Sequence, residues 1–278
     1  MAYETILFEV QDRIATVTLH RPDRMNAWNA QMARELSDVM RRAEGDDEIR
    51  AVIVTGHGKA FCAGADLQAG GETFGARRQG VIDASDEDRA ATFPWQIHKP
   101  VIAAINGHAI GVGITYPMTC DIRFVAEDAK VQFAFVRRGI IPELASHSIV
   151  ARVAGLSRAA DLLLTGRMIR GRQLAEMGLA SAALPADKVL DAARACAREF
   201  LQAAPVSVAI AKRLLWDGLT TSVADMARRE DPLFAWAGRQ PDAREGVTAF
   251  LEKREPQWRM KASTDLPRDL LGLDGSKR

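Results

Sequence analysis

The sequence predicts an α/β domain followed by a helical C-terminal region. Short β-branched, apolar runs alternate with turns and amphipathic segments along the N-terminal part, whereas helical periodicity dominates after about Leu156. Runs of the first kind are typical of strands, and apolar residues at three- and four-residue spacing are typical of helices. A pattern of two strands and one helix recurs in the N-terminal part, and this recurrence indicates a layered, coiled α/β arrangement.

The length of the chain fits one large domain or one and a half domains. The chain has 278 residues, against about 150 residues in a common domain. A long predicted helix ends at Ala204, because the residue before a proline avoids the helical conformation. We therefore expect a core over residues 1–204 and a helical region with a tail over residues 205–278.

Three N-terminal segments are predicted strands, at residues 5–10, 14–20 and 51–56. Residues 26–47 are predicted to form a surface helix, because their apolar side chains lie on one stripe. Asn29 can cap the start of this helix, and Gly45 is expected past its end. The stripe consists of Trp28, Met32, Leu36, Val39, Met40 and Ala43.

The remaining elements follow from the same patterns. Residues 67–94 mix glycines with both signs of charge and lack periodicity, so we interpret them as an excursion from the core. Strands are predicted at residues 99–107 and, as a pair, within residues 121–133. Helices are predicted within residues 157–169, 171–180 and 185–205, and from residue 207 onward.

The composition argues against several classes of partner. Lys and Arg number 37 against 36 Asp and Glu, so a net charge of +1 gives no electrostatic reason to expect nucleic acid or a membrane surface. We find no signal-peptide pattern and no apolar stretch of membrane-spanning length, so we expect a cytoplasmic protein. Three cysteines without C-x-x-C spacing and five histidines without an H-E-x-x-H pair give no reason to expect a metal site.

Two segments combine a strand, a turn of small residues and a predicted helix start, namely AVIVTGHGKAFCAGADL at residues 51–67 and VIAAINGHAIGVGI at residues 101–114. Free backbone N–H groups at such starts favour an anionic oxygen, and two such donors that meet would form an oxyanion hole. The alternative is that the small residues only let two backbones pack closely. A dinucleotide site and a serine-hydrolase site are unsupported, because neither G-x-G-x-x-G nor G-x-S-x-G occurs.

Two side chains near these turns are candidates for chemistry. Glu143 follows Ile141-Pro142 at a predicted loop-to-helix junction among apolar residues, where burial would raise the pKa of its carboxyl. The alternative for Glu143 is a first-turn glutamate that stabilises the helix dipole. Cys62 is predicted to be a buried hydrophobe rather than a nucleophile, since no histidine is implicated beside it.

An ordered set of motifs resembles the enoyl-CoA hydratase/isomerase (crotonase) superfamily from about Ile6 to Trp258. The set is RPDRMNAWN, GHGKAFCAGADL, KPVIAAINGHAIGVGITYPMTCDIRFVAEDAKVQF, RRGIIPE, LLLTGRMI, AEMGLASAALPADKV and AFLEKREPQW. The resemblance implies a spiral of β-β-α units with a helical C-terminal trimerisation region. It also implies a homotrimer or a dimer of trimers, and an acyl-CoA thioester substrate that brings the coenzyme A, so no separate cofactor is expected.

The resemblance implies roles for particular residues. The backbone N–H groups of Ala65 and Val112 would form the oxyanion hole, and a valine side chain at 112, where glycine is common, would narrow the acyl slot. Phe250 and Lys253 would contact coenzyme A, although helix packing and a solvated charge are the alternatives. The implied substrate-binding and coenzyme A-binding residues are Met25, Ala27, Ala63, Asp66, Leu67, Gly111, Phe135, Phe250 and Lys253.

The chain departs from the family where typical hydratases carry two glutamates. Thr115 and Phe135 stand at those places, and neither can act as a base. Glu143 instead matches the acid of peroxisomal-type 3,2-enoyl-CoA isomerases, with Phe135 as an apolar wall. The resemblance therefore favours 3,2-enoyl-CoA isomerisation with Glu143 as the proton shuttle. A hydratase or another crotonase reaction is the first alternative, and a non-catalytic acyl-CoA-binding protein is the second.

Overall fold

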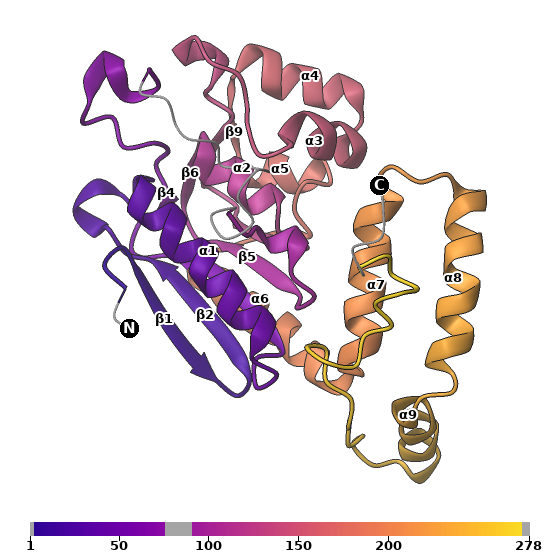
Figure 1. The fold of residues 1–278 in the computed structure, drawn as a ribbon. Helices are drawn as coiled ribbons and strands as arrows, with labels where there is room; N and C mark the ends of the chain where they lie inside the picture. The colour runs from indigo at the N-terminus through magenta and orange to yellow at the C-terminus, as the bar shows by residue number, and fades with distance from the viewer. Residues whose placement is uncertain (1–2, 76–90, 274–278) are drawn as a thin grey trace.

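Two β-sheets form the centre of the computed structural model, which describes residues 3–75 and 91–273 (Figure 1). The larger sheet has the strand order β1-β2-β3-β5-β7-β10, and the smaller sheet has the order β4-β6-β8-β9. The larger sheet contains β1 (Ile6–Gln11), β2 (Ile14–Leu19), β3 (Ala51–Gly56), β5 (Val101–Ile105), β7 (Ile122–Ala126) and β10 (Ala182–Leu184). The smaller sheet contains β4 (Ala60–Cys62), β6 (His108–Ile110), β8 (Lys130–Gln132) and β9 (Met168–Arg170).

The chain alternates between the two sheets. β3, β5 and β7 lie in the larger sheet, and each is followed within a few residues by β4, β6 or β8 of the smaller sheet. The turns are tight: a Cβ atom on Gly107 would lie 2.2 Å from the Lys59 carbonyl oxygen, so only glycine fits there. This alternation confirms the predicted spiral of β-β-α units. It also places the strands predicted within residues 121–133 in different sheets rather than side by side.

Helices cover the sheets and extend the chain at its C-terminal end. α6 packs against β3, β5 and β7, and α1 packs against β1. The helices of the core are α1 (Ala30–Gly45), α2 (Val112–Met118), α3 (Ser146–Ala154), α4 (Leu156–Thr165), α5 (Gly171–Glu176) and α6 (Val189–Glu199). They are followed by α7 (Pro205–Gly218), α8 (Val223–Ala237) and α9 (Pro241–Glu252).

α1 shows how the local sequence sets an element that supports the site. The Asn29 side chain accepts a hydrogen bond from the Met32 backbone N–H at 2.8 Å, which confirms the predicted N-cap. Every residue of the predicted apolar stripe is buried. Gly45 is the last helical residue rather than the first one beyond the helix, and Asp46 is the C-cap.

The sequence patterns predicted only helices after about Leu156. The structure corrects this prediction, because the region also contains two short strands. β9 and β10 are three-residue strands that pair with β8 and β7. α4 stops at Thr165, because Gly166 adopts a left-handed conformation with φ of 56°, and the chain then extends into β9. These strands form because they pair with segments distant in the sequence, and their own sequence pattern does not specify them.

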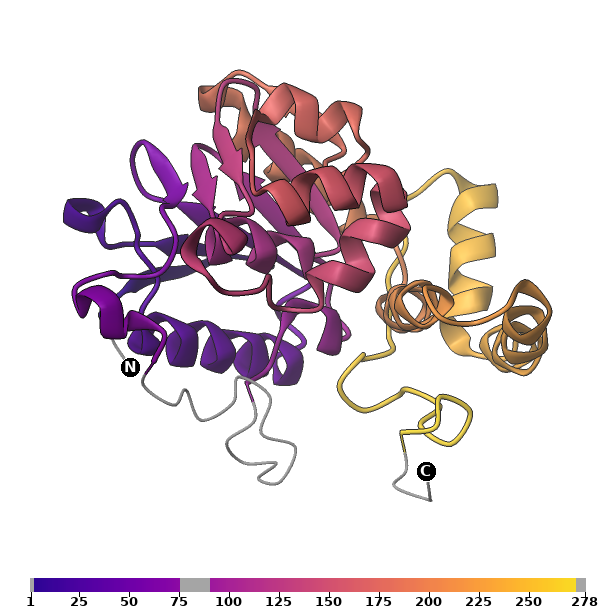
Figure 2. The same cartoon turned by 90° about the horizontal axis from the view of Figure 1, so that it is seen from above.

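The C-terminal helices stand to one side of the two sheets in both views (Figures 1 and 2). Val206, Ile210, Leu233 and Leu271 form a small hydrophobic cluster separate from the main core. Several large apolar side chains on these helices are exposed, namely Leu215, Val223, Phe234, Val247, Phe250 and Leu251. Over residues 3–75 and 91–273, no helix is both long and apolar enough to cross a membrane.

Candidate active site

A cavity of about 120 Å³ lies where the turn after β4, the turn after β6 and the loop before α3 meet. Its lining is mostly apolar and contains one carboxylate and one guanidinium among the described residues. The lining residues are Ala63, Gly64, Ala65, Leu67, Phe74, Ile110, Gly111, Val112, Ala134, Phe135, Arg138, Ile140, Ile141 and Glu143.

The first wall of the cavity is the segment after β4. Residues Trp28 and Ala65 form a parallel bridge, in which Trp28 N–H donates to the Gly64 carbonyl at 2.7 Å and Asp66 N–H donates to the Trp28 carbonyl at 2.8 Å. The Ala65 N–H lies between these bonds and finds no acceptor among the described residues. Gly64 has a φ of 101°, which a residue with a side chain rarely adopts.

The second wall is the start of α2. Gly111 has φ of 56° and ψ of −122°, and its carbonyl accepts hydrogen bonds from the N–H groups of Ile114 and Thr115 at 3.0 and 3.1 Å. Val112 is the first residue of α2, and its N–H has no acceptor in the described part of the chain. The Val112 amide is therefore available to an oxygen in the cavity, as is that of Ala65.

The backbones of these two segments are in close contact at Gly113 and Cys62. A Cβ atom on Gly113 would lie 2.3 Å from the Cys62 carbonyl oxygen, so a side chain at this position would push α2 away from β4. Close packing was the alternative to anion binding for these turns. The structure contains both features at different residues: Gly107 and Gly113 allow close packing, while the amides of Ala65 and Val112 have no acceptor within residues 3–75 and 91–273.

Glu143 lies in the loop before α3 and lines the cavity. α3 begins at Ser146, whose N–H and hydroxyl both donate to the Glu143 carbonyl oxygen, at 3.2 and 2.7 Å. The alternative of a first-turn helix glutamate is therefore wrong, because Glu143 lies three residues before the first helical residue. Leu144 and Ala145 between them both have φ of 55°, so this loop is held in a strained conformation next to the cavity.

Phe135 and Thr115 occupy different environments. Phe135 is only 6 % exposed and lines the cavity, in agreement with an apolar wall. Thr115 is completely buried in α2, and its side chain does not belong to the lining. Its hydroxyl has no hydrogen-bond partner among the described residues.

The predicted coenzyme A-binding residues fall into three groups. Ala63, Leu67 and Gly111 line the cavity. Met25, Ala27 and Asp66 lie beside it in segments that are tied together, because Ala63 N–H donates to the Met25 carbonyl at 3.0 Å and Arg21 bonds to both Asp66 and Ala27. The Arg21 guanidinium, 2.8 Å from Asp66, holds the pKa of that carboxyl below its usual value.

Phe250 and Lys253 form the third group, and the single chain does not bring them to the cavity. Phe250 lies on α9 and is 81 % exposed, and Lys253 is the C-cap of that helix. Figure 1 places α9 at the lower end of the C-terminal helices, far from β4, β6 and α2. Neither residue belongs to the cavity lining.

Arg138, Phe74 and Ile140 line the cavity but were not predicted from the sequence. Arg138 and Ile140 belong to the same RRGIIPE motif as Glu143, so the motif as a whole was the available signal. Phe74 lies in the segment of residues 67–94, which has no periodic pattern to mark a lining residue. The middle of that segment, residues 76–90, lies outside the described residues.

The structure gives no chemical role to the remaining candidate groups among the described residues. Cys62 is completely buried, and burial raises the pKa of its thiol to about 12, which rules out the thiolate needed for a nucleophile. A larger cavity of about 180 Å³ near Arg50 and Lys99 lies elsewhere, and both cations are already bonded to backbone carbonyls. Within the described ranges, no group of three or more His, Cys, Asp or Glu side chains is placed to hold a metal ion.

Two backbone amides without an acceptor in the described part of the chain and one carboxylate surround an apolar cavity. Such an arrangement can bind a carbonyl compound whose oxygen gains negative charge during reaction. Residues 9–261 match the family model described as enoyl-CoA hydratase/isomerase. The chain therefore belongs to the enoyl-CoA hydratase/isomerase family, whose members act on acyl-CoA thioesters.

The similarity to individual proteins covers almost the whole chain. A probable enoyl-CoA hydratase of Mycobacterium bovis is 35 % identical over 261 residues, covering 93 % of this chain and 99 % of the relative. A 1,2-epoxyphenylacetyl-CoA isomerase of Escherichia coli is 34 % identical over 257 residues, covering 92 % of this chain and 98 % of the relative. The crystal structure of a probable enoyl-CoA hydratase/isomerase from Mycobacterium abscessus superposes with a TM-score of 0.84 at 37 % identity, covering 92 % of this chain and 99 % of that one.

Proposed function

We propose that the protein is a 3,2-enoyl-CoA isomerase in which Glu143 transfers the proton. The observation that carries the proposal is the position of Glu143. It is the one carboxylate among the described lining residues, and the same cavity is lined by Ala65 and Val112, whose N–H groups have no acceptor among the described residues. A 1,3-proton shift needs one group that first accepts and then returns a proton.

The proposed reaction balances without a co-reactant. The thioester carbonyl oxygen accepts hydrogen bonds from the N–H groups of Ala65 and Val112, and the Glu143 carboxylate removes a proton from C2 of a 3-enoyl-CoA. The electron pair of the broken C–H bond delocalises into a dienolate, whose charge rests on the carbonyl oxygen. Protonation at C4 by the Glu143 carboxyl then gives the 2-enoyl-CoA. Each amide donor contributes about 3 to 4 kcal/mol to such a step.

The apolar lining supports this reaction. Phe135, Ile140 and Val112 face the cavity and leave few groups that could bind water beside the acyl chain. Exclusion of water protects the dienolate from stray protonation and strengthens the hydrogen bonds to its oxygen. Coenzyme A enters as part of the substrate, and the proposed chemistry uses no separate cofactor or metal ion.

Hydration of a 2-enoyl-CoA is the second candidate, and the names of the relatives favour it. Several of the similar proteins are described as probable or putative enoyl-CoA hydratases. Hydration uses carboxylates to position and deprotonate water. In the described lining Glu143 would need a second group for this task, and Thr115 is buried away from the cavity. Acyl-CoA binding without turnover is the remaining alternative.

The test compares Glu143→Gln with the unchanged protein on matched 2-enoyl-CoA and 3-enoyl-CoA thioesters. We expect the unchanged protein to move the double bond of the 3-enoyl ester without a change of mass, and the variant to lose this activity while still binding the ester. Glu176→Gln is the matched control, because Glu176 is an exposed glutamate on α5 outside the cavity.

Mass spectrometry distinguishes the candidates. A product heavier by one water molecule identifies a hydratase, and turnover that survives Glu143→Gln contradicts the role of Glu143. Bound esters without any turnover favour the non-catalytic alternative.

We also propose that the protein forms a homotrimer or a dimer of trimers. The exposed apolar side chains on α7, α8 and α9 support an assembly in which other copies cover them. Such an assembly is also the arrangement in which Phe250 and Lys253 could approach a coenzyme A site that they do not reach within one chain. Light scattering after size-exclusion chromatography measures the number of copies.

A further inference from the structure

The cavity of about 180 Å³ near Arg50 and Lys99 has no group suited to catalysis, but its lining is basic. On one side lie the turn after β1 and the segments just before β3 and β5, and on the other lies the C-terminal segment of residues 258–262. Within the described part of the chain, five cationic side chains and two carboxylates line the cavity, an excess of three positive charges when His98 is neutral. The cations are Arg13, Arg50, Lys99, Arg259 and Lys261, and the carboxylates are Asp47 and Glu48.

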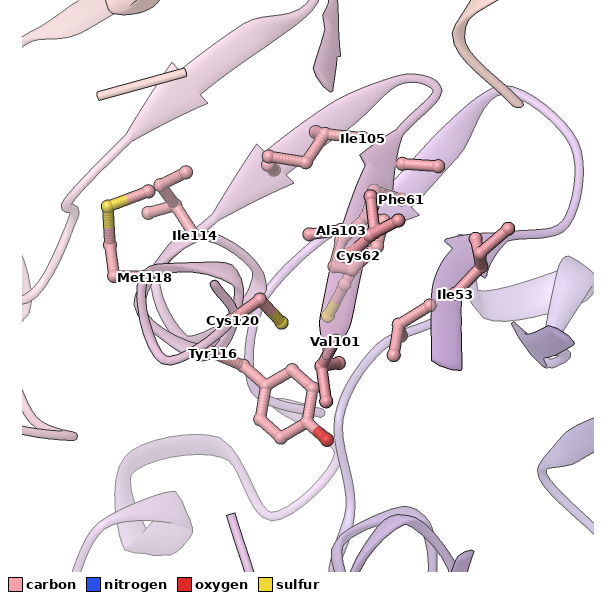
Figure 3. Close-up of a cluster of buried hydrophobic side chains, with 14 of the residues drawn as sticks. Ile53, Phe61, Cys62, Val101, Ala103, Ile105, Ile114, Tyr116, Met118 and Cys120 are labelled. Carbon is pink, nitrogen blue, oxygen red and sulfur yellow. The ribbon is translucent and has the colours of Figure 1, made fainter. Parts of the chain in front are cut away.

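This cavity lies at the opposite end of the larger sheet from the candidate active site. Arg50 and Pro100 directly precede β3 and β5, whereas the turns of the candidate active site follow β4 and β6, beyond the carboxyl ends of these strands. β3 has six residues and spans about 20 Å. Between the two ends, Ile53 of β3 and Val101 and Ala103 of β5 belong to one fully buried cluster (Figure 3). The cavity is therefore a separate site.

Arg50 brings unused hydrogen-bond donors to this cavity. The residue is 6 % exposed, and its Nη2 atom donates to the carbonyl oxygens of Phe200 and Ala203 at 3.0 and 2.6 Å. Its Nε and Nη1 atoms have no acceptor among the described residues, and neither is one of the enclosed polar atoms that lack a partner. Both nitrogens therefore have accessible surface, and the cavity is the space that Arg50 lines.

The carboxylates around the cavity balance the charge of Arg50 only in part. Burial and then the charge of Arg13 lower the pKa of Arg50, and the opposing charges of Asp242 and Asp47 do not restore it. Glu48, the other carboxylate of the lining, lies 3.6 Å from Arg13. A bound anion would remove this imbalance, because a negative charge nearby favours the protonated guanidinium.

The C-terminal segment supplies two further cations to the cavity. The backbone N–H groups of Arg259 and Lys261 donate to Asp242 and Asp265, each at 2.8 Å. Both residues are exposed, and among residues 3–75 and 91–273 their charged groups form no hydrogen bond or ion pair. Backbone contacts thus hold the segment beside the cavity, while both side-chain charges remain available to a ligand.

We propose that this cavity binds a phosphate dianion, either as inorganic phosphate or as the phosphate group of an ester. Arg50 donates to it from the core, and Arg259 and Lys261 donate to it from the C-terminal segment, so the anion ties that segment to the core. Hydrogen bonds between such charged groups are about twice as strong as neutral ones. A dianion also compensates more of the positive excess than chloride or a single carboxylate. The volume is sufficient, since one molecule of liquid water takes only about 30 Å³.

Titration calorimetry with inorganic phosphate, at pH 8 and constant ionic strength, tests the proposal. We expect one phosphate to bind per chain. Arg259→Gln combined with Lys261→Gln should weaken this binding about tenfold or more, because it removes two charge-assisted hydrogen bonds. These exposed residues are better targets than Arg50, because replacement of Arg50 would also break its bonds to the Phe200 and Ala203 carbonyls.

Lys188→Gln combined with Arg239→Gln is the matched control. Both residues are exposed cations outside the cavity, and the pair changes the net charge by the same amount, so phosphate binding should stay as in the unchanged protein. Hydrogen exchange gives a second readout: phosphate should slow exchange in residues 258–262 of the unchanged protein and the control, but not of the Arg259/Lys261 variant. Phosphate also stabilises proteins by exclusion from their surface, an effect that all three proteins would share.

Ribose 5-phosphate distinguishes the two sources of the anion. Tighter binding than that of inorganic phosphate identifies an ester as the ligand, and equal or weaker binding identifies the free ion. Three results would overturn the proposal: no saturable phosphate binding, an affinity that the Arg259/Lys261 variant retains, or a loss of affinity that the control shares. The measurement contains no acyl-CoA, so its outcome is independent of the proposed isomerase reaction.

Discussion

The Lys212 ammonium on α7 lies 2.8 Å from the Asp121 carboxylate, which follows α2, and both side chains are largely buried. Asp121 also accepts hydrogen bonds from the Trp216 indole and the Val101 backbone N–H, each at 2.7 Å. Burial lowers the pKa of Lys212, whereas the Asp121 charge opposes this shift. This ion pair thus joins α7 to the segment between α2 and β7, close to the start of β5.

Lys212→Ala should lower the free energy of unfolding by about 3 to 5 kcal/mol, because it leaves the Asp121 carboxylate buried without its cation. Urea unfolding at a fixed protein concentration measures the change. Lys188→Ala is the control, since the Lys188 side chain is 63 % exposed and its ion pair with Asp187 should contribute little. Equal effects of the two substitutions would show that the buried ion pair has no special role.

Val112→Pro should lower kcat about 100- to 1000-fold, because it removes one donor of the proposed oxyanion hole. Proline is well tolerated at the first position of a helix, where Val112 lies, so the backbone should keep its course. Val112→Ala retains the N–H and removes most of the side chain, and it should cost far less. A similar loss of kcat in the two variants would assign the effect to the side chain rather than to the amide.

Glu44 should make the stability of the fold depend on pH in the acid range. Burial raises the pKa of its carboxyl, but hydrogen bonds from the His98 ring and backbone N–H outweigh this and bring it below the usual 4.5. The unfolded chain therefore binds more protons, so the stabilisation is present above about pH 4.5 and is lost as the pH falls through the folded-state pKa. Glu44→Gln should flatten this dependence in urea unfolding at several pH values, whereas Glu48→Gln, at an exposed site, should leave it unchanged.

The three cysteines should differ in their reaction with iodoacetamide at pH 8. Burial raises the pKa of Cys62 and of Cys120 to about 12, and both are fully enclosed. Cys196 is half-buried, and it should react about tenfold faster or more. Peptide mass spectrometry identifies the labelled sites, with the unfolded chain as the reference in which all three react. Labelling of Cys62 at the rate of Cys196 in the folded protein would contradict this burial.

Elements with a strong local pattern could be predicted from the sequence. β1, β2, β3 and β5 carry β-branched runs, and α1 carries both an apolar stripe and a capping residue. β9 and β10 were missed because three residues are too few to show a period, and their conformation depends on the strands beside them.

The residues of the candidate site also differ in how far the sequence could predict them. Ala65, Val112 and Glu143 could be proposed from motifs, since each lies at a turn that its own segment specifies, and the structure brings all three to one cavity. Their catalytic roles stay predictions. The hydroxyl of Tyr116, which lacks a partner among the described residues, had no signal in the sequence, because the burial of this side chain depends on packing against residues such as Trp28, which lies far away along the chain.

The contact between Gly113 and the Cys62 carbonyl has a consequence for how such a site can change. Main-chain atoms alone fix the spacing of the two amide donors, so exchange of the side chains around the cavity leaves that spacing intact. The acid enters from a separate loop, which can place a carboxylate without disturbing the amides. In the proposed mechanism, main-chain amides stabilise the negative charge, whereas exchangeable side chains determine which reaction takes place. Redesign of this protein toward another acyl-CoA reaction should therefore begin at Glu143 and Phe135 and leave the glycines untouched.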